Sequence, residues 1–331
     1  MGGRNEAFQA DFLAGDAGGY GVHHDLPAIG NYDASAATLC IVQNRREGCP
    51  CITMTIYQRR LYMKERMQVL VEQTLYGEVD KVQMAITRLK LHEPKEGYYV
   101  AFSGGKDSCV VLDLCKRAGV KFDAHMNITT VDPPEVIKFV HDYHPEVTME
   151  RPIRPMRETI RLKKVMPTRL VRYCCAIYKE RGGGGRVVVT GVRHQESTRR
   201  KQRHLVEPCR GARKGWFIHP IIEWTSDEVW EYIHKYNLPY CKLYDEGFKR
   251  IGCISCPMSS GKKMKLEAAR WPEIFNNQWR KGAEYVAKEG RFDLKTADEV
   301  IDWWVSGKSI KDYTKDDDIV IFGLVGDETM T

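Results

Sequence analysis

The sequence predicts an α/β protein with a doubly wound parallel sheet, an N-terminal helical segment and a mostly helical C-terminal region. Short apolar runs alternate with helical patterns through the middle of the 331 residues. Such alternation is typical of a parallel sheet with crossover helices. The first apolar run leads through SGGKDS, residues 103–108, straight into a helical pattern, and beyond Gly261 the chain is mostly helical in pattern.

Each expected element follows from its local pattern. Strands are predicted where short apolar runs are bounded by Gly, Pro or polar residues, at 98–102, 121–129, 146–150 and 186–192. Helices are predicted where apolar residues recur at helical spacing or follow a capping residue, at 108–117, 133–143, 156–165 and 225–237.

The chain divides into four expected segments, at 1–53, 54–96, 97–240 and 241–331. The first is rich in Gly, Ala and Asp without a sustained period, which indicates a weakly ordered extension. The second is a helical lead-in, because apolar residues recur at helical spacing from Val79 to Leu89. The third carries the alternating strands and helices, and the fourth joins a cysteine-containing loop to helical patterns.

Composition excludes several classes of protein. Hydrophobic residues make up 43% and charged residues 29% of the chain, as in ordinary globular proteins. No apolar run reaches the roughly 18 residues of a membrane span, and the N-terminus lacks the pattern of a signal peptide. We therefore expect a cytoplasmic protein without a membrane partner. The net charge of +7 permits a nucleic acid or a phosphorylated ligand but identifies neither.

The corner at 103–108 has the composition of a polyphosphate site. Its residues are Ser103, Gly104, Gly105, Lys106, Asp107 and Ser108. The two glycines let the backbone approach a ligand closely, and the free amides at the start of the next helix favour an anion. The hydroxyls and the lysine ammonium add further donors. The spacing satisfies neither the Walker motif nor G-x-G-x-x-G.

A second candidate anion site follows the apolar strand at 186–192. Its residues are Gly191, Arg193, Glu196, Ser197 and Arg200. The glycine permits a turn, and the two guanidinium groups offer planar forks suited to phosphate or sulfate. Because ligands bind at the carboxyl ends of parallel strands, we expect this segment and the 103–108 corner to share one edge of the sheet.

Four of the eleven cysteines form two close pairs, Cys174–Cys175 and Cys253–Cys256. Stable disulfides are uncommon in cytosolic proteins, so this clustering indicates a metal site or reactive thiols. Four thiolates suit a 4Fe–4S cluster or a tetrahedral zinc ion. Cys241 remains an alternative fourth ligand.

These motifs together resemble a known family. SGGKDS is similar to the PP-loop of the ATP pyrophosphatases, and G-V-R-x-x-E-S-x-x-R at 191–200 resembles the anion-binding signature of its phosphoadenosine phosphosulfate (PAPS) reductase-like branch. The similarity continues through TTVDPPE, RYCCAIYKE, PIIEWTSDEVWEYI and YCKLYDEGFKRIGCISCP, over about residues 78–260.

The resemblance implies an adenine nucleotide alpha hydrolase-like fold with its PP-loop nucleotide-binding domain at 97–240 and an adenine contact near Thr130. It also implies ATP or an adenylylated sulfonucleotide, Mg²⁺, and a 4Fe–4S cluster in preference to zinc. The catalytic residues would be Lys106, Asp107 and Arg193, which would position the phosphates and stabilise their charge.

One departure from the family bears on the reaction. Sulfonucleotide reductases attack sulfur with a cysteine near the C-terminus, and no cysteine follows Cys256 in this sequence. The organisation is closest to the DNA-phosphorothioation proteins of the same branch. It implies an ATP-dependent adenylating enzyme in sulfur transfer to a nucleic acid, with a cysteine desulfurase-type sulfur donor and a homodimeric assembly.

Two alternatives stay open. One is a sulfonucleotide reductase that takes its thiol from a partner or from Cys49 and Cys51. The other is a nucleotide- and cluster-binding sensor or scaffold without turnover.

Overall fold

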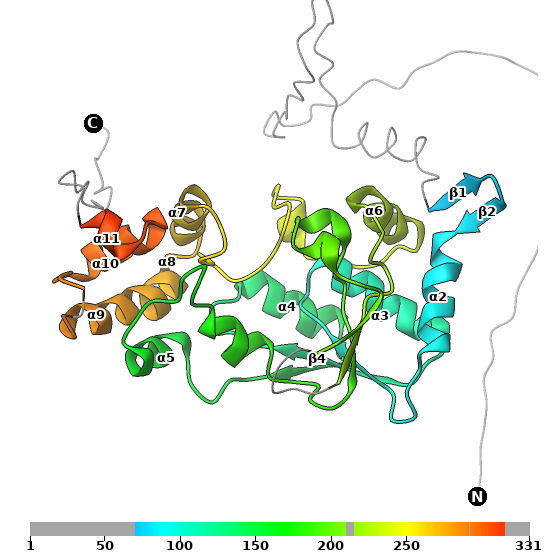
Figure 1. Ribbon diagram of the computed structural model, residues 1–331, viewed down its shortest axis with the longest axis horizontal. Helices are drawn as coiled ribbons and strands as arrows, with labels where there is room; N and C mark the ends of the chain where they lie inside the picture. Colours follow the sequence, from blue (N-terminus) through cyan, green and yellow to red (C-terminus); the bar gives the residue numbers. More distant parts are fainter. Residues whose placement is uncertain (1–69, 210–214, 291, 315–331) are drawn as a thin grey trace, which may run out of the picture. The chain divides into compact units, whose positions relative to one another are not determined.

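Helices flank a six-stranded, mostly parallel sheet in the computed structural model (Figure 1). The structure describes residues 70–209, 215–290 and 292–314, all within the unit Arg66–Thr331. The expected extension at 1–53 lies outside the described residues. No helix in the described ranges is long and apolar enough to cross a membrane.

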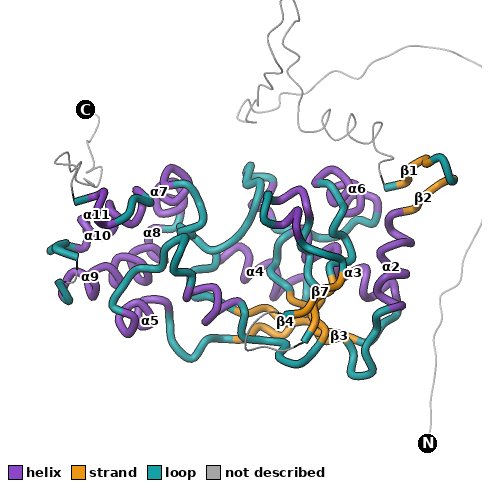
Figure 2. The backbone as a smooth tube through the Cα atoms, in the orientation of Figure 1, coloured by secondary structure: helices purple, strands orange, loops and turns teal. Residues whose placement is uncertain are grey.

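The sheet has the strand order β5–β4–β3–β6–β8–β7, and the strands are drawn in orange in Figure 2. Its strands are β3 Tyr98–Ala101, β4 Phe122–Asn127, β5 Val147–Glu150, β6 Val187–Val189, β7 Val206–Pro208 and β8 Trp216–Ile218. Five of them pair in parallel, and Val100 of β3 lies opposite Ala124 of β4 and Val189 of β6. All four strands expected from the apolar runs are confirmed.

The edge strand β7 runs antiparallel to β8, which corrects the expectation of a wholly parallel sheet. Parallel neighbours need a crossover of about a dozen or more residues, and the link from Pro208 to Trp216 is too short to provide one. The amide of Cys209 donates to the carbonyl of Gly215 at 2.9 Å and helps to close this hairpin. Neither β7 nor β8 was predicted, because neither belongs to a run of strand-forming valines like that of β6.

The helices of the central region match their predicted positions. They are α3 Lys106–Ala118, α4 Pro134–Tyr143, α5 Met156–Lys163 and α6 Ser226–Lys235. The expected helical C-terminal region is also confirmed, with α7 Gly261–Arg270, α8 Pro272–Ile274, α9 Lys281–Lys288, α10 Ala297–Ser306 and α11 Ile310–Tyr313. Two π-helical turns, at Cys175–Lys179 and Phe275–Arg280, complete the helical elements used below.

A β-hairpin replaces part of the helical lead-in expected at 54–96. Strands β1 Val71–Thr74 and β2 Gly77–Asp80 pair antiparallel, and the helix α2 is confined to Lys81–Leu91. Gly77 adopts φ +115°, which few other residues tolerate, and so supports the turn. The carboxylate of Asp80 accepts hydrogen bonds from the amides of Val82 and Gln83 and fixes the helix start.

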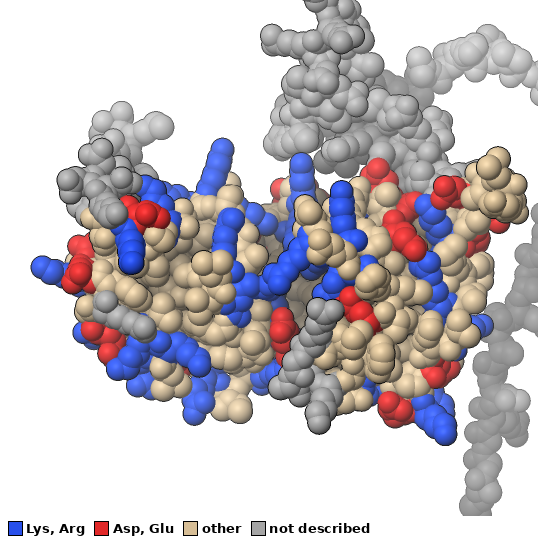
Figure 3. Space-filling model, viewed as in Figure 1, with Lys and Arg blue, Asp and Glu red and all other residues tan. Residues whose placement is uncertain are grey.

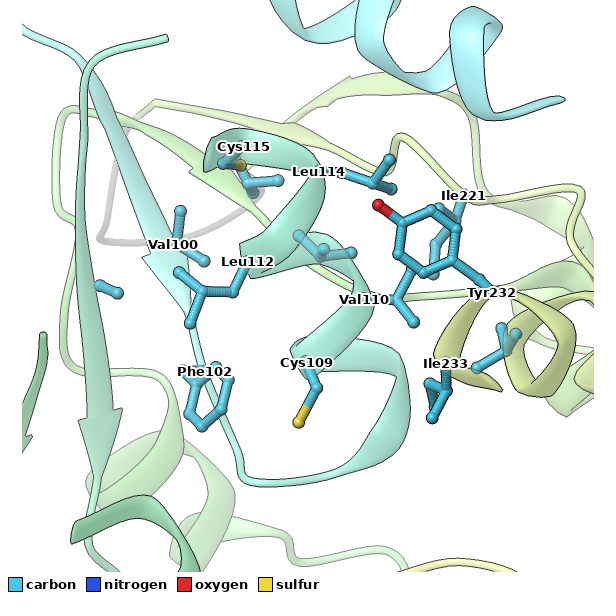
Figure 4. Close-up of a cluster of buried hydrophobic side chains, with 14 of the residues drawn as sticks. Val100, Phe102, Cys109, Val110, Leu112, Leu114, Cys115, Ile221, Tyr232 and Ile233 are labelled. Atoms are coloured by element: carbon cyan, nitrogen blue, oxygen red, sulfur yellow. The ribbon is translucent and has the colours of Figure 1, made fainter. Parts of the chain in front are cut away.

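Two hydrophobic clusters hold the described residues together. The larger lies between the sheet and helices α2, α3, α4 and α6. Within it, α3 directs Leu112 toward Val100 of β3, and Val110 toward Tyr232 of α6 (Figure 4). The second cluster joins α5 to the C-terminal helices and buries the side chains of Trp279, Trp303 and Trp304. Both clusters border the loops that carry the candidate site.

Candidate active site

The candidate anion-binding segments lie where the strand order reverses. Strand β3 has β4 on one side and β6 on the other. It runs into the 103–108 corner and α3, whereas β6 runs into Thr190 and Gly191. In open α/β sheets such a reversal leaves a crevice outside the carboxyl ends of the strands. The structure therefore brings the two predicted segments to one sheet edge, as expected.

The 103–108 corner is closely packed, and the residue that precedes α3 provides no side-chain cap. Gly104 has φ +68°, and a Cβ there would lie 2.6 Å from Cγ1 of Val136. Gly105 is the residue before the helix and offers no side-chain acceptor to the first amides. The hydroxyl of Ser108 donates to the carbonyl of Gly105 at 2.7 Å and is buried. Ser108 thus braces the loop, while Ser103 is exposed and lies at its surface.

Lys106 is a buried cation held by its neighbour. Its side chain is only 6% exposed, and its ammonium lies 3.0 Å from both carboxylate oxygens of Asp107. Burial lowers the pKa of Lys106, the carboxylate of Asp107 opposes that effect, and the nearby guanidinium groups of Arg193 and Arg250 add to it. The ammonium is therefore poorly solvated, which strengthens its interaction with any anion that reaches the corner.

Arg193 is placed to hold Asp107. Its Nε lies 2.6 Å from Oδ1 of Asp107, and its side chain is 3% exposed. One terminal nitrogen donates to the carbonyl of Trp224 at 3.1 Å, and the other donates to the hydroxyl of Ser226 at 3.3 Å. Because protein acceptors engage these groups, the geometry favours a positioning role for Arg193 over the direct phosphate contact that the sequence suggested.

The rest of the 191–200 segment packs against the corner. A Cβ on Gly191 would lie 2.9 Å from the backbone carbon and oxygen of Asp107, so only glycine allows this approach. The carboxylate of Glu196 accepts from the amide of Arg193 at 3.1 Å and forms an ion pair with Arg200. Burial, aided by Arg250, lowers the pKa of Arg200 to about 10.

Two other predicted residues serve the loops. The hydroxyl of Ser197 accepts from the amide of Arg200 at 3.3 Å. Thr130 has φ +66°, and its hydroxyl accepts from the amide of Met156 at 3.0 Å, which ties the loop after β4 to the start of α5. The adenine contact near Thr130 stays a prediction.

The four paired cysteines line one cavity. Cys174, Cys175, Cys253 and Cys256 share its wall with Thr129, Val131, Met156, Tyr178, Lys179, Pro257 and Trp279. The amide of Ile254 donates to the carbonyl of Val131 at 2.8 Å, and the thiol of Cys253 lies 3.5 Å from the hydroxyl of Thr129. Both contacts join the cysteine loop to the loop after β4, so the cavity adjoins the sheet edge that carries the nucleotide corner.

Cys241 lies elsewhere. It is buried in the larger hydrophobic cluster, within electrostatic reach of Cys109 on α3, and does not line the four-cysteine cavity. The structure therefore does not support Cys241 as the alternative fourth ligand. Its place follows from the long-range packing of the 241–244 turn under α3, which spacing along the chain does not reveal.

The cavity combines thiols with positive charge. The hydrogen bond with Cys174, and the guanidinium of Arg172 at 3.5 Å from the sulfur, lower the pKa of Cys175. The negative charge of the Cys253 thiolate raises the pKa of Lys179. Among the described residues, no three Cys, His, Asp or Glu side chains are already arranged to hold a single metal ion.

Comparisons with known proteins agree with these features. Residues 97–259 match the family model of the phosphoadenosine phosphosulfate reductase domain. An adenosine 5'-phosphosulfate reductase of Oceanobacillus iheyensis is 31% identical over 189 residues, which cover 52% of this chain and 75% of that protein. This chain belongs to the phosphoadenosine phosphosulfate reductase domain family.

Other relatives of this PAPS reductase domain protein differ in extent. An uncharacterized protein of Methanocaldococcus jannaschii is 32% identical over 206 residues, covering 57% of this chain and 43% of that protein. The chain thus spans less than half of this archaeal relative. The crystal structure of PAPS reductase from Candida auris, a phosphate complex, has a TM-score of 0.41 and 18% identity, over 61% of this chain and 97% of that chain.

Two residues that contact or influence the candidate site of this PAPS reductase domain protein were not predicted from the sequence. The hydroxyl of Tyr244 accepts a hydrogen bond from the amide of Lys106 at 2.9 Å. Arg250 influences the pKa values of both Lys106 and Arg200. Both lie in YCKLYDEGFKRIGCISCP, between the nucleotide corner and the cysteine loop. The only available signal was that this stretch lies in the region of family resemblance.

Proposed function

We propose that this chain is an ATP pyrophosphatase that adenylates an acceptor in a sulfur-transfer reaction, with an iron–sulfur cluster bound by its four paired cysteines. One observation carries the proposal. The cavity lined by Cys174, Cys175, Cys253 and Cys256 adjoins the sheet edge that holds the PP-loop corner, through the bonds of Ile254 and Cys253 to the loop after β4. Sulfur chemistry and nucleotide activation can therefore share one site.

The PP-loop corner is suited to hold ATP with Mg²⁺ by its β- and γ-phosphates. An acceptor oxygen then attacks the α-phosphorus, an oxygen–phosphorus bond forms, and pyrophosphate leaves. Lys106 stabilises the charge that develops on the leaving group. Asp107 aligns the Lys106 ammonium at 3.0 Å, and Arg193 holds Asp107 in place.

The second step replaces oxygen by sulfur. Hydrosulfide attacks the adenylated atom, the bond to AMP oxygen breaks, and AMP leaves with that oxygen. This substitution consumes no oxidant or reductant. It yields a thiolated or phosphorothioated acceptor, AMP and pyrophosphate.

The residues of the cavity fit an iron–sulfur cluster. All four candidate ligands are thiols, which iron–sulfur clusters and zinc prefer. Lys179 and Arg172 supply positive charge beside them, which offsets the negative charge of a thiolate-bound centre. Such a cluster would supply a site for sulfur delivery or would brace the cysteine loop, and zinc remains the alternative occupant.

A nucleic acid is the acceptor that the surface charge favours. Lys and Arg side chains gather around a hollow on the face drawn in Figure 3. The chain carries a net charge of +7, and a phosphate backbone binds such surfaces electrostatically. In this proposal a cysteine desulfurase-type protein provides the sulfur as a persulfide, an external dithiol reduces that persulfide and is oxidised to a disulfide as hydrosulfide is released, and the working form is a homodimer.

A second candidate is a sulfonucleotide reductase that uses a thiol from another protein. The 31% identity to an adenosine 5'-phosphosulfate reductase favours it. The same anion corner would then bind the nucleotide's sulfate or phosphate groups.

An isotope-exchange assay separates these activities. Anaerobically purified protein is incubated with ATP, Mg²⁺, labelled pyrophosphate and DNA or RNA, and label entering ATP is measured. We expect acceptor-dependent exchange, and we expect Lys106→Ala to reduce it at least about a hundredfold because it removes charge stabilisation of the leaving group. Thioredoxin-dependent sulfite release without exchange would establish the reductase instead, and nucleotide binding without either activity would indicate a sensor or scaffold.

A further inference from the structure

Thr190 lies at the reversal of strand order but was not among the residues expected to bind the nucleotide. It directly follows β6, and its amide donates to the carbonyl of Ile218 in β8 at 3.0 Å. The next residue, Gly191, packs against the backbone of Asp107 in the first turn of α3. Thr190 is half-buried. Thr190 therefore directly precedes the glycine that packs against the anion corner.

A fully buried imidazole contacts this hydroxyl. His219 directly follows β8 and is 0% exposed. Its Nδ1 lies 2.7 Å from Oγ1 of Thr190, and its Nε2 lies 3.2 Å from a terminal nitrogen of Arg203. Arg203 also forms an ion pair with Glu207, whose carboxylate is 3.5 Å from the same Nε2.

These partners determine which nitrogen carries the proton. Nε2 of His219 lies nearer to Arg203, at 3.2 Å, than to the carboxylate of Glu207, at 3.5 Å. Because guanidinium nitrogens donate hydrogen bonds and do not accept them, the shorter contact makes Nε2 the acceptor from Arg203. In the neutral ring the proton then resides on Nδ1 and is donated to Oγ1 of Thr190. Burial, and secondarily the charge of Arg203, lower the pKa of His219 to about 4, so the ring is neutral near pH 7.

The hydroxyl proton of Thr190 is consequently left for another acceptor. Oγ1 accepts from His219, so its own hydrogen must point away from the imidazole. Among the described residues, Thr190 Oγ1 forms no second hydrogen bond. A hydroxyl fixed in this way is a preorganised donor at the edge where the anion corner opens.

We infer that Thr190 donates a hydrogen bond to an anionic phosphate or sulfate oxygen of the bound nucleotide, and that His219 and Arg203 are its positioning residues. This inference rests on the proposed nucleotide site and adds a ligand-binding residue to it. It also gives Arg203 a role, since it orients His219 through Nε2.

Threonine variants test the donor directly. Thr190→Val removes the hydroxyl and keeps the shape, whereas Thr190→Ser keeps the hydroxyl. Calorimetric titration with α,β-methylene ATP should show affinity about tenfold weaker for the valine variant and within about threefold of wild type for serine. Titration with adenosine, which has no phosphate, should give the same affinity for all three proteins.

Two histidine variants test the positioning. The amide nitrogen of His219→Asn stands near the place of Nδ1 and can still donate to Thr190, whereas that of His219→Gln stands near Nε2 and faces Arg203. We expect the asparagine variant to keep most of the affinity for α,β-methylene ATP and the glutamine variant to match Thr190→Val. The double variant Thr190→Val/His219→Gln should be no weaker than either single variant, because both remove one interaction.

The outcomes distinguish this inference from the function proposed above. Failure of the wild-type protein to bind α,β-methylene ATP would overturn both. Binding by the wild type with equal affinity in Thr190→Val would overturn only the role of Thr190. Parallel losses of α,β-methylene ATP and adenosine binding would show that Thr190 supports the fold and would likewise overturn the inference.

Discussion

Substitution of Gly191 by alanine should disturb both stability and the anion corner. The added Cβ would lie 2.9 Å from the backbone carbon and oxygen of Asp107 and 3.0 Å from its Cβ. Ordinary contacts of this kind begin near 3.4 Å, so β6 and the first turn of α3 must separate by roughly half an ångström. Backbone atoms cannot rotate away as a flexible side chain could, and the strain therefore falls on the site itself.

The expected cost is that of overpacking a well-filled interior, about 1–3 kcal/mol in the free energy of unfolding. Because Asp107 holds Lys106 and is held by Arg193, its displacement should also weaken nucleotide binding by about tenfold or more. Urea-induced unfolding followed by circular dichroism measures the first effect, and calorimetric titration with α,β-methylene ATP measures the second.

Gly252→Ala is the matched control. A Cβ at Gly252 meets no heavy atom within 4 Å, and its φ is not in the left-handed region. Its unfolding free energy should stay within about 0.5 kcal/mol of wild type. If Gly191→Ala unfolds at the same urea concentration as this control and binds nucleotide normally, then the close approach of the 191 turn to α3 is wrong.

Three further predictions concern metal content and pH. Cys253→Ser should lose iron and the absorbance near 400 nm of anaerobically purified protein, whereas Cys241→Ser should keep both; loss in both variants would contradict the ligand assignment. His219 has a lowered pKa, so its stabilising effect is complete above about pH 6.5 and declines as pH falls toward 4. Between these pH values the free energy of unfolding of the wild-type protein should fall by up to about 3 kcal/mol more than that of His219→Asn. If the free energies of unfolding of the two proteins change in parallel with pH, the burial of His219 as a neutral ring is refuted. The hydrogen bonds of Arg186 lower the pKa of Asp123, so that stabilisation is present above about pH 4 and disappears in stronger acid. The melting temperature of Asp123→Asn should therefore fall less steeply than that of wild type as the pH is lowered from 6 to 2, as measured by thermal melts.

Local sequence patterns predicted most of the fold. The apolar runs and helical periodicities predicted strands β3 to β6 and helices α3 to α6, because each pattern reflects the burial of one face of its own element. The hairpin at Val71–Asp80 was predicted as helix, since a few apolar residues at helical spacing outweighed the turn signal of Gly77. Strands β7 and β8 were missed because, unlike β6, neither contains a run of strand-forming valines.

The candidate site was also predicted only in part from the sequence. The composition of SGGKDS and the two cysteine pairs determined, from the sequence alone, which residue types are available for phosphate and for metal. Only the tertiary structure showed that all four paired cysteines line one cavity while Cys241 lies in another cluster. It also showed that Tyr244 contacts the amide of Lys106.

Arg193 and Thr190 show why this division arises. The sequence alone specifies that a guanidinium and a hydroxyl follow β6, because residue type and position along the chain do not depend on tertiary contacts. Which groups engage them was decided by β8, α6 and the first turn of α3, which bring Trp224, His219 and Asp107 beside them. Backbone conformation depends chiefly on neighbouring residues, whereas the partner and charge state of a buried polar group depend on distant segments that packing brings into contact.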